Sequence, residues 1–359
     1  MVVLAGLPQI AFAEVVRADD GRLQWMGRIS LSETGAATMA YPGVAVRFAY
    51  RGDAPVLLLR AHSENCFFNL SINGWESAVL HLKEGENRVP LVAGAAPASG
   101  WEVALVRRTE AWQGLVTFEG IETAATGEIL PGSSWPERKL MVIGDSITTG
   151  HYIEQLPGVG DSSPRTNNAE RTWGWLLAEA LDAQVHIVAY GGRGLTRTWD
   201  GRTDQANAPQ FFERALPDSD GANARWDHAS YHPDLIVVML GQNDFSRSML
   251  EREEFVGPYV TFLERVAEVH PDAVVVLAGS PMHGTTPGSE DVAKRDRLYG
   301  FLREVVELRR TSSRASLAVV EISHQPGTSL NSHPTVFQNE QIAAEILPVV
   351  RELTGWVAE

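Results

Sequence analysis

In the first third of the chain, apolar and polar residues alternate over short runs, which is the pattern of strands with one buried face. The runs at 44–50 and 101–106 are examples, and turn sequences rich in Asn, Asp and Gly separate such runs. Many short strands divided by turns predict an antiparallel β-sandwich, which we place at residues 14–127. The segment 128–136 contains a Pro-Gly-Ser-Ser run, and we interpret it as a linker.

After residue 136 the pattern changes, and short apolar runs alternate with stretches of helical period. The expected strands lie at 140–143, 185–189, 235–240, 273–278 and 317–322, and the expected helices at 171–183, 209–216, 253–270, 291–310 and 334–353. Strands that are apolar on both faces and alternate with helices are typical of a parallel sheet covered on both sides. We therefore expect residues 137–359 to form a three-layer, flavodoxin-like α/β domain with a five-stranded parallel sheet.

Length and charge narrow the classes of function. A chain of 359 residues exceeds one typical domain, which agrees with the two-part pattern. The net charge of −15 argues against nucleic acid or an anionic membrane as a partner. The single cysteine, Cys66, excludes an internal disulfide, and no apolar run after the first residues is long enough to cross a bilayer. The sequence leaves open whether the chain forms a homo-oligomer.

The first 13 residues are apolar and end in Ala-Phe-Ala, which is similar to a signal-peptidase site, although the usual basic start is missing. We interpret residues 1–13 as the remnant of a signal peptide, which favours a secreted or periplasmic location. An ordinary N-terminal strand is the alternative.

Three predicted strands end in residues that suit acyl transfer. They are followed by Ser146, by the glycine-rich turn around Gly192, and by Asn243. The carboxyl ends of parallel strands lie side by side, so these residues can converge where open α/β sheets bind their ligands. Ser146 would be the nucleophile. Its own N–H, the Gly192 N–H and the Asn243 amide would stabilise the oxyanion.

A nucleophilic serine also needs a base, and the chain has ten histidines. His333 precedes Pro334 at the expected start of the last helix, on the same edge of the sheet as Ser146. We prefer it to His151, His283 and His324, which share that edge.

Other residues near these strand ends receive supporting roles. Asp145 and Asp244 are expected to organise the loops beside Ser146 and Asn243 through backbone amides. The candidates to line a substrate pocket are Arg193, Trp199, Phe245 and Tyr152.

The set of Gly144-Asp145-Ser146, Gly192, Gly241-x-Asn243-Asp244 and His333-Pro334 resembles the four sequence blocks of the SGNH (GDSL-type) hydrolases. With the predicted sandwich in front, the chain resembles carbohydrate esterase family two, whose members join a jelly-roll-like domain to an SGNH domain. The segments 107–120 and 233–246 are also similar to that family's sequence. The resemblance implies removal of acetyl groups from carbohydrates of the xylan or mannan type, without metal or cofactor.

One position departs from the SGNH pattern, which usually has an aspartate three residues before the histidine. Leu330 occupies that position here. We therefore expect a Ser146–His333 dyad, in which a backbone carbonyl or the Asn331 side chain accepts the hydrogen bond from His333 Nδ1.

Two alternatives to the carbohydrate deacetylase remain at this stage. One is another SGNH esterase that acts on small acyl esters or on peptidoglycan acetyls. The other is a carbohydrate-binding protein with weak catalysis, which the missing aspartate and the β-sandwich favour. No HExxH sequence, paired cysteines or compact His/carboxylate cluster predicts a metal site.

Overall fold

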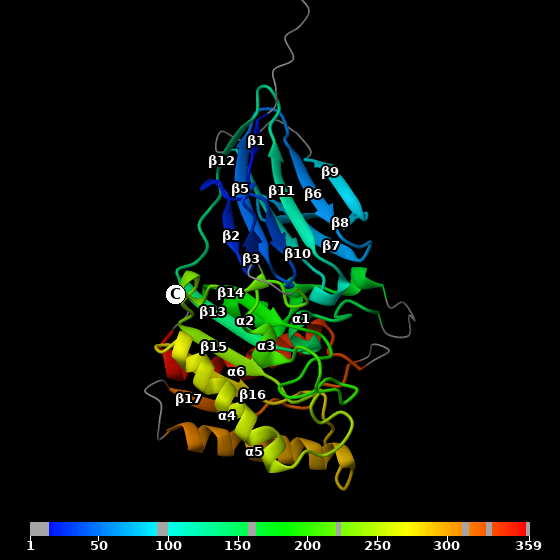
Figure 1. The fold of residues 1–359 in the computed structure, drawn as a ribbon, viewed down its shortest axis with the longest axis vertical. Coiled ribbons are helices and arrows are strands. Elements are labelled where there is room, and N and C mark those ends of the chain that lie inside the picture. Colours follow the sequence, from blue (N-terminus) through cyan, green and yellow to red (C-terminus); the bar gives the residue numbers. More distant parts are fainter. Residues whose placement is uncertain are drawn as a thin grey trace, which may run out of the picture.

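The computed structural model describes residues 14–91, 100–156, 163–219, 224–310, 316–327 and 332–356. It consists of an antiparallel β-sandwich that stands on an α/β domain (Figure 1). The expected fold class, a sandwich followed by a five-stranded parallel sheet, is confirmed. Residues 1–13, which we interpreted as a signal-peptide remnant, lie outside the described residues.

The sandwich contains twelve strands among the described residues: β1 (Val15–Val16), β2 (Gln24–Met26), β3 (Ile29–Leu31), β4 (Ala37–Met39), β5 (Ala45–Arg51), β6 (Val56–Ala61), β7 (Cys66–Ile72), β8 (Trp75–Leu82), β9 (Gly85–Pro90), β10 (Trp101–Arg107), β11 (Val116–Glu122) and β12 (Glu128–Pro131). One sheet has the order β3-β4-β11-β6-β9 with β1 beside β11, and the other has β12-β5-β10-β7-β8 with β2 beside β5. All of these pairs are antiparallel.

The segment expected to be a linker differs from the prediction at its start. Glu128–Pro131 forms β12, which pairs with β5 and extends the second sheet. An unpaired strand edge offers free backbone groups, so a passing segment gains hydrogen bonds by joining it, and proline is tolerated at such an edge. Only residues 132–136 then lead to the parallel sheet.

The α/β domain has strands β13 (Arg138–Gly144), β14 (Ala183–Ala189), β15 (Leu235–Met239), β16 (Val274–Ala278) and β17 (Leu317–Val320). Its helices are α1 (Ser146–Thr149), α2 (Trp173–Ala180), α3 (Ala208–Phe211), α4 (Arg252–Val269), α5 (Glu290–Arg310) and α6 (Val336–Thr354). The strand order β14-β13-β15-β16-β17 is that of flavodoxin-like sheets. The helix expected at 209–216 is only the single turn α3, and the carbonyls of Phe211 and Phe212 accept from side chains of the sandwich instead of continuing a helix.

Neighbouring residues of β13 face opposite layers, as the period of two in a strand requires. Leu140 and Val142 belong to the apolar cluster that includes α2 and α6, whereas Met141 and Ile143 belong to the cluster that includes α4 and α5. Both faces of the sheet are therefore buried, which explains why its strands are apolar throughout.

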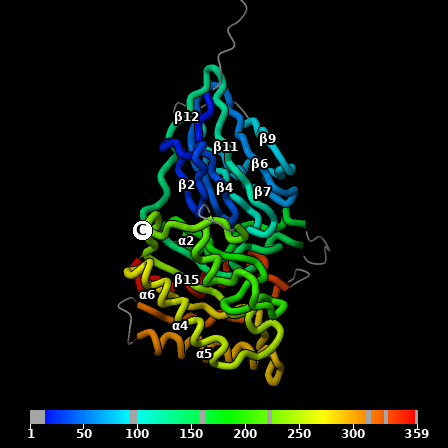
Figure 2. The backbone as a smooth tube through the Cα atoms, viewed as in Figure 1, coloured from blue at the N-terminus to red at the C-terminus, as the bar shows by residue number. Residues whose placement is uncertain are grey.

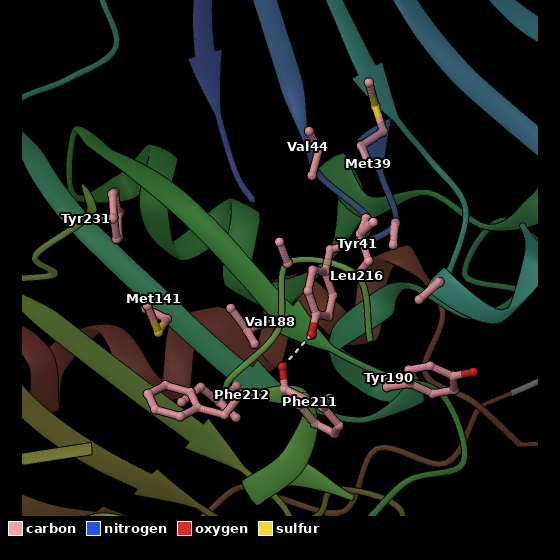
Figure 3. Close-up of a cluster of buried hydrophobic side chains, with 14 of the residues drawn as sticks. Met39, Tyr41, Val44, Met141, Val188, Tyr190, Phe211, Phe212, Leu216 and Tyr231 are labelled. Atoms are coloured by element: carbon pink, nitrogen blue, oxygen red, sulfur yellow. Dashed lines mark hydrogen bonds between the residues drawn. The ribbon is translucent and has the colours of Figure 1, made fainter. Parts of the chain in front are cut away.

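The sandwich and the α/β domain share one core. The cluster on the α4/α5 face continues through Met39, Tyr41 and Val44 of the sandwich (Figure 3). The Tyr41 hydroxyl donates to the Phe211 carbonyl at 2.7 Å, and the buried Arg28 donates to the Phe212 carbonyl at 2.6 Å. The backbone trace shows the first third of the chain, which forms the sandwich, directly above the rest, which forms the α/β domain (Figure 2).

Candidate active site

Ser146 is the first residue of α1, and only Asp145 separates it from the end of β13. The Asp145 carboxylate caps this helix by accepting from the Ile147 N–H at 3.0 Å. As the first helical residue, Ser146 keeps an N–H with no intrahelical partner. A side chain at Gly144 would lie 2.1 Å from Thr148 Oγ1, so the turn requires glycine there. The backbone thus presents the serine at the carboxyl edge of the sheet.

His333 lies against Ser146. Its Nε2 is 2.7 Å from Ser146 Oγ, the distance required between a nucleophile and its base. His333 stands just before α6, whose N-cap Thr335 exchanges a capping box with Gln338. When Nε2 of His333 carries no proton, it accepts a hydrogen bond from the serine hydroxyl, so the pair is set for proton transfer. Asn331, the predicted alternative partner of His333 Nδ1, lies outside the described residues.

Gly192 and Asn243 line the same cavity of about 690 Å³ as Ser146 and His333. Gly192 has a φ of +76°, which glycine adopts without strain. Asn243 Nδ2 donates to the Arg193 carbonyl at 2.8 Å and more weakly to Asp145 Oδ2 at 3.3 Å. All four residues that the sequence suggested for the reaction therefore meet at one place.

The two buried aspartates organise loops, but not both as expected. Burial raises the pKa of Asp145 to about 7, helped by the nearby charges of Asp244 and Glu110. Asp244 accepts from the backbone N–H groups of Leu195 at 2.9 Å and Thr196 at 2.8 Å. It therefore fastens the loop that follows Gly192, and not the amides beside Asn243. Burial raises its pKa as well, against these hydrogen bonds.

Two of the four pocket candidates line the cavity. Arg193 lies 4.9 Å from the Tyr190 ring centroid, and Trp199 is 57% exposed at the rim. Phe245 does not line the cavity, because it is fully buried and packs against Phe255 and Phe301.

Tyr152, the remaining candidate, stands one layer behind the cavity. It is not among the residues that line the cavity, and its ring centroid lies 4.0 Å from that of His151.

Sequence reasoning assigned no role to residues of the sandwich, yet Trp112 lines the cavity and is 47% exposed. Two residues earlier, the fully buried Glu110 bonds Nδ1 of His151, which also lines the cavity. The signal that could have found them was the similarity of 107–120 to family two sequences.

Within the described ranges no three His, Cys, Asp or Glu side chains gather as a metal site. No helix of that part of the chain has the length and apolar character to cross a membrane.

Comparison with known proteins identifies the family of the chain. Residues 25–132 match the "Carbohydrate esterase 2 N-terminal" family and residues 142–324 match the "GDSL-like Lipase/Acylhydrolase family". The chain is 32% identical to an acetylxylan esterase / glucomannan deacetylase of Cellvibrio japonicus, over 95% of this chain and 91% of that protein.

Solved structures agree with these matches. A family two carbohydrate esterase from Cellvibrio japonicus has a TM-score of 0.86 and 32% identity, over 96% of this chain and 99% of its own. One from Clostridium thermocellum, in complex with cellohexaose, has a TM-score of 0.84 and 26% identity, over 93% of this chain and 100% of its own. The resemblance read from the sequence is confirmed. With a GDSL-like domain that holds a serine and a histidine in contact, the protein is a carboxylic ester hydrolase and belongs to the family two carbohydrate esterases.

Proposed function

We propose that the protein removes O-acetyl groups from polysaccharides or oligosaccharides of the xylan or mannan type, with Ser146 as nucleophile and His333 as base. The observation that carries this proposal is the 2.7 Å contact between His333 Nε2 and Ser146 Oγ inside a cavity open to solvent. The name of the Cellvibrio japonicus relative, an acetylxylan esterase / glucomannan deacetylase, supports the substrate class.

In the first half of the reaction, Ser146 Oγ attacks the acetyl carbonyl carbon while its proton passes to His333 Nε2. The negative charge that develops on the carbonyl oxygen is met by the N–H groups of Ser146 and Gly192. The Asn243 amide joins them by exchanging its weaker, 3.3 Å bond to Asp145 for one to the oxyanion. The intermediate collapses when the bond to the sugar oxygen breaks and His333 returns its proton to that oxygen.

In the second half, a water molecule loses a proton to His333 and attacks the acetyl-serine. The Ser146–carbonyl bond breaks, acetate leaves, and the proton returns to Ser146 Oγ. Each half thus uses the same base and the same oxyanion donors. The two halves together consume one ester and one water molecule and regenerate Ser146 and His333.

Two exposed tryptophans suit a sugar substrate. Trp199 belongs to the α/β domain and Trp112 to the sandwich, and both line the cavity. Indole rings offer large apolar faces on which pyranose rings pack, while their N–H remains available for hydroxyl groups. A related esterase was solved with bound cellohexaose, which is a chain of pyranose rings.

Acetate release from acetylated xylan and acetylated glucomannan tests the proposal directly. The wild type should release acetate from at least one of them, and Ser146→Ala should release none above background. Activity on neither substrate, with good turnover of small esters, would favour the small-ester alternative. Binding of the polysaccharide without acetate release would favour the weakly catalytic carbohydrate-binding alternative.

Acyl length gives a second measurement. We expect p-nitrophenyl acetate to be hydrolysed at least ~10-fold faster than the butyrate, which corresponds to about 1.4 kcal/mol in the barrier. Equal rates would contradict acetyl specificity.

A further inference from the structure

The segment between β10 and β11 brings sandwich residues into the active site. Arg107, which is fully buried, fixes this turn by donating to the backbone carbonyls of Thr109 at 3.0 Å and Glu110 at 3.1 Å. The next residue, Arg108, donates to the Asn167 carbonyl of the α/β domain at 3.0 Å. The turn is therefore attached to both halves of the molecule, and its residues have defined positions at the carboxyl edge of the parallel sheet.

Glu110 places a buried carboxylate at this edge. Its Oε1 is bonded to His151 Nδ1 and accepts from Asn167 Nδ2 at 3.3 Å. Its Oε2 lies against Gly191, where an added Cβ would come within 2.1 Å of it. Gly191 directly precedes the oxyanion residue Gly192. Among the residues that the structure describes, Glu110 forms its ion pair with His151, when that ring is protonated.

His151 connects this carboxylate to the base. Its backbone N–H donates to the Ser146 backbone carbonyl at 3.2 Å, just beyond the end of α1. Its ring packs edge to face on the His333 ring, with centroids 4.7 Å apart, while Tyr152 packs on it at 4.0 Å. The side chains thus follow one another in the order Glu110, His151, His333, Ser146.

We propose that Glu110 and His151 are positioning residues for His333, and that Glu110 supplies the negative charge which a triad aspartate supplies in other serine hydrolases. This inference rests on the proposed roles of Ser146 and His333. When Ser146 gives its proton to His333, an imidazolium forms, and a fixed, buried anion nearby lowers its energy. The position three residues before His333, where the aspartate is expected, is Leu330.

The charge state of Glu110 supports this assignment. Burial alone would raise the pKa of Glu110, but the charge and hydrogen bond of His151, the Thr149 hydroxyl and the charge of His333 together hold it below its usual range. The carboxylate is therefore ionised at neutral pH. The other charged groups near this pair are Asp145 before α1, Arg107 at the end of β10, Arg108 directly after it, Glu154 paired with Arg108, Arg193 after β14 and Asp244 after β15. They are unchanged in the variants below.

The test is the pH profile of kcat/KM for p-nitrophenyl acetate. Its acidic limb reports protonation of the free enzyme's base. Glu110→Gln keeps the size and hydrogen-bonding capacity of the side chain and removes the charge. We expect kcat/KM at its plateau to fall by about 10- to 100-fold and the midpoint of the acidic limb to move to lower pH by at least about half a unit, because the imidazolium loses its anion. A midpoint that stays in place or moves to higher pH would overturn the proposal.

Two variants separate charge from folding. Glu110→Asp keeps the charge and should restore the wild-type midpoint even where it lowers kcat. Glu170→Gln removes a carboxylate that accepts from Asn69 at the same domain junction, away from the cavity, and should leave profile and rate unchanged. If Glu170→Gln shifts the midpoint as Glu110→Gln does, the effect is a general one of the junction and the proposal is wrong. Unchanged near-UV circular dichroism shows that the fold is kept.

His151→Gln tests the connecting ring. Gln can still donate to Glu110 but cannot pack on His333, so kcat should fall by about 10-fold while the midpoint stays near that of the wild type. An unchanged kcat would remove His151 from the proposal. Ser146→Ala distinguishes a failure of this inference from a failure of the proposed function. If Ser146→Ala retains activity, the serine mechanism is wrong, whatever the result for Glu110→Gln.

Discussion

Histidines gather at both ends of the parallel sheet, and their surroundings differ. At the carboxyl edge, His333 contacts a hydroxyl and His151 a carboxylate. Towards the amino edge, His186 in the middle of β14 stacks on the Tyr231 ring, with centroids 3.5 Å apart. His270, after α4, lies among the rings of Phe212, His228 and His232. Burial is the main reason that the pKa of His270 falls to about 3 and that of His186 falls well below its usual value.

The comparison separates two uses of one side chain. A buried imidazole without an acidic partner stays neutral and fills space, because charging it would cost desolvation energy. An imidazole that faces a cavity open to solvent and contacts a nucleophile can take up and release a proton during turnover. His283 shows that the edge alone does not decide, since burial lowers its pKa to about 4 although it is near the active edge. The partner, more than the position in the fold, decides the role.

The strongest way to break this comparison is to remove the active pair. Ser146→Ala and His333→Ala should each lower kcat by ~10⁴-fold or more, and the double variant should be hardly worse, because residues that act as one unit are not additive. The assay is hydrolysis of p-nitrophenyl acetate, with circular dichroism to verify folding. His228→Gln at the amino edge, the matched control, should stay within a few-fold of the wild type. A comparable loss in the control would contradict the distinction between the edges.

A smaller loss is expected from the oxyanion site. Asn243→Ala removes a donor to the developing charge, and we expect kcat to fall by roughly 10²–10³-fold with little change in KM. Steady-state kinetics on p-nitrophenyl acetate give both constants. A higher KM at unchanged kcat would mean that Asn243 only binds the substrate.

Asn331→Ala sharpens the comparison within the active edge. If a backbone carbonyl and the charge of Glu110 support His333, this variant should lose ~10-fold or less. A loss near ~10³-fold with the fold intact would mean that the Asn331 side chain orients His333. The same assay as for the active pair resolves these outcomes.

The smallest effect concerns the amino edge and acid stability. The pKa of His270 in the folded protein, about 3, is below its unfolded value of about 6.5. Its contribution to stability is therefore complete above pH 6.5 and decreases as the pH falls from there toward 3, because the unfolded chain takes up the proton first.

Replacing this imidazole should weaken the pH dependence. We expect His270→Phe to reduce the loss of unfolding free energy between pH 7 and 5 by about 1 kcal/mol. Urea unfolding at the two pH values measures the difference between the proteins. The buried Asp145, whose pKa is raised, changes the unfolding free energy with pH in the opposite direction. It does so equally in the wild type and in the variant, so its effect cancels in the difference between them. Equal pH dependence in the two proteins would contradict the assignment.

The residues at strand ends could be predicted because their positions follow from local pattern. Four apolar residues before Gly144 identify a buried strand, and the topology of parallel sheets then brings Ser146, Gly192 and Asn243 together. The direction of a single side chain after a strand does not follow in this way. Phe245 turned into the core, where its ring packs against Phe255 and Phe301 and is removed from water.

Contacts between the two domains could not be predicted at all. Glu110 and His151 are 41 positions apart and belong to different parts of the fold, so no periodicity or spacing relates them. The edge strand β12 was missed for a similar reason, since its stability comes from the partner strand β5 and not from its own four-residue sequence, which ends in Pro131.

The attachment of the turn 107–113 to both domains has a consequence for inheritance. Exchange of the sandwich for another module at residues 132–136 would leave an α/β domain without Trp112 at its cavity and without Glu110 beside His151. The shared apolar core around Tyr41 and Phe211 would also be exposed to water. We therefore expect recombination at this boundary to be selected against, so that the two parts are inherited together. We also expect a substitution at position 110 to be accompanied by one at position 151, because the two side chains contact each other across the boundary.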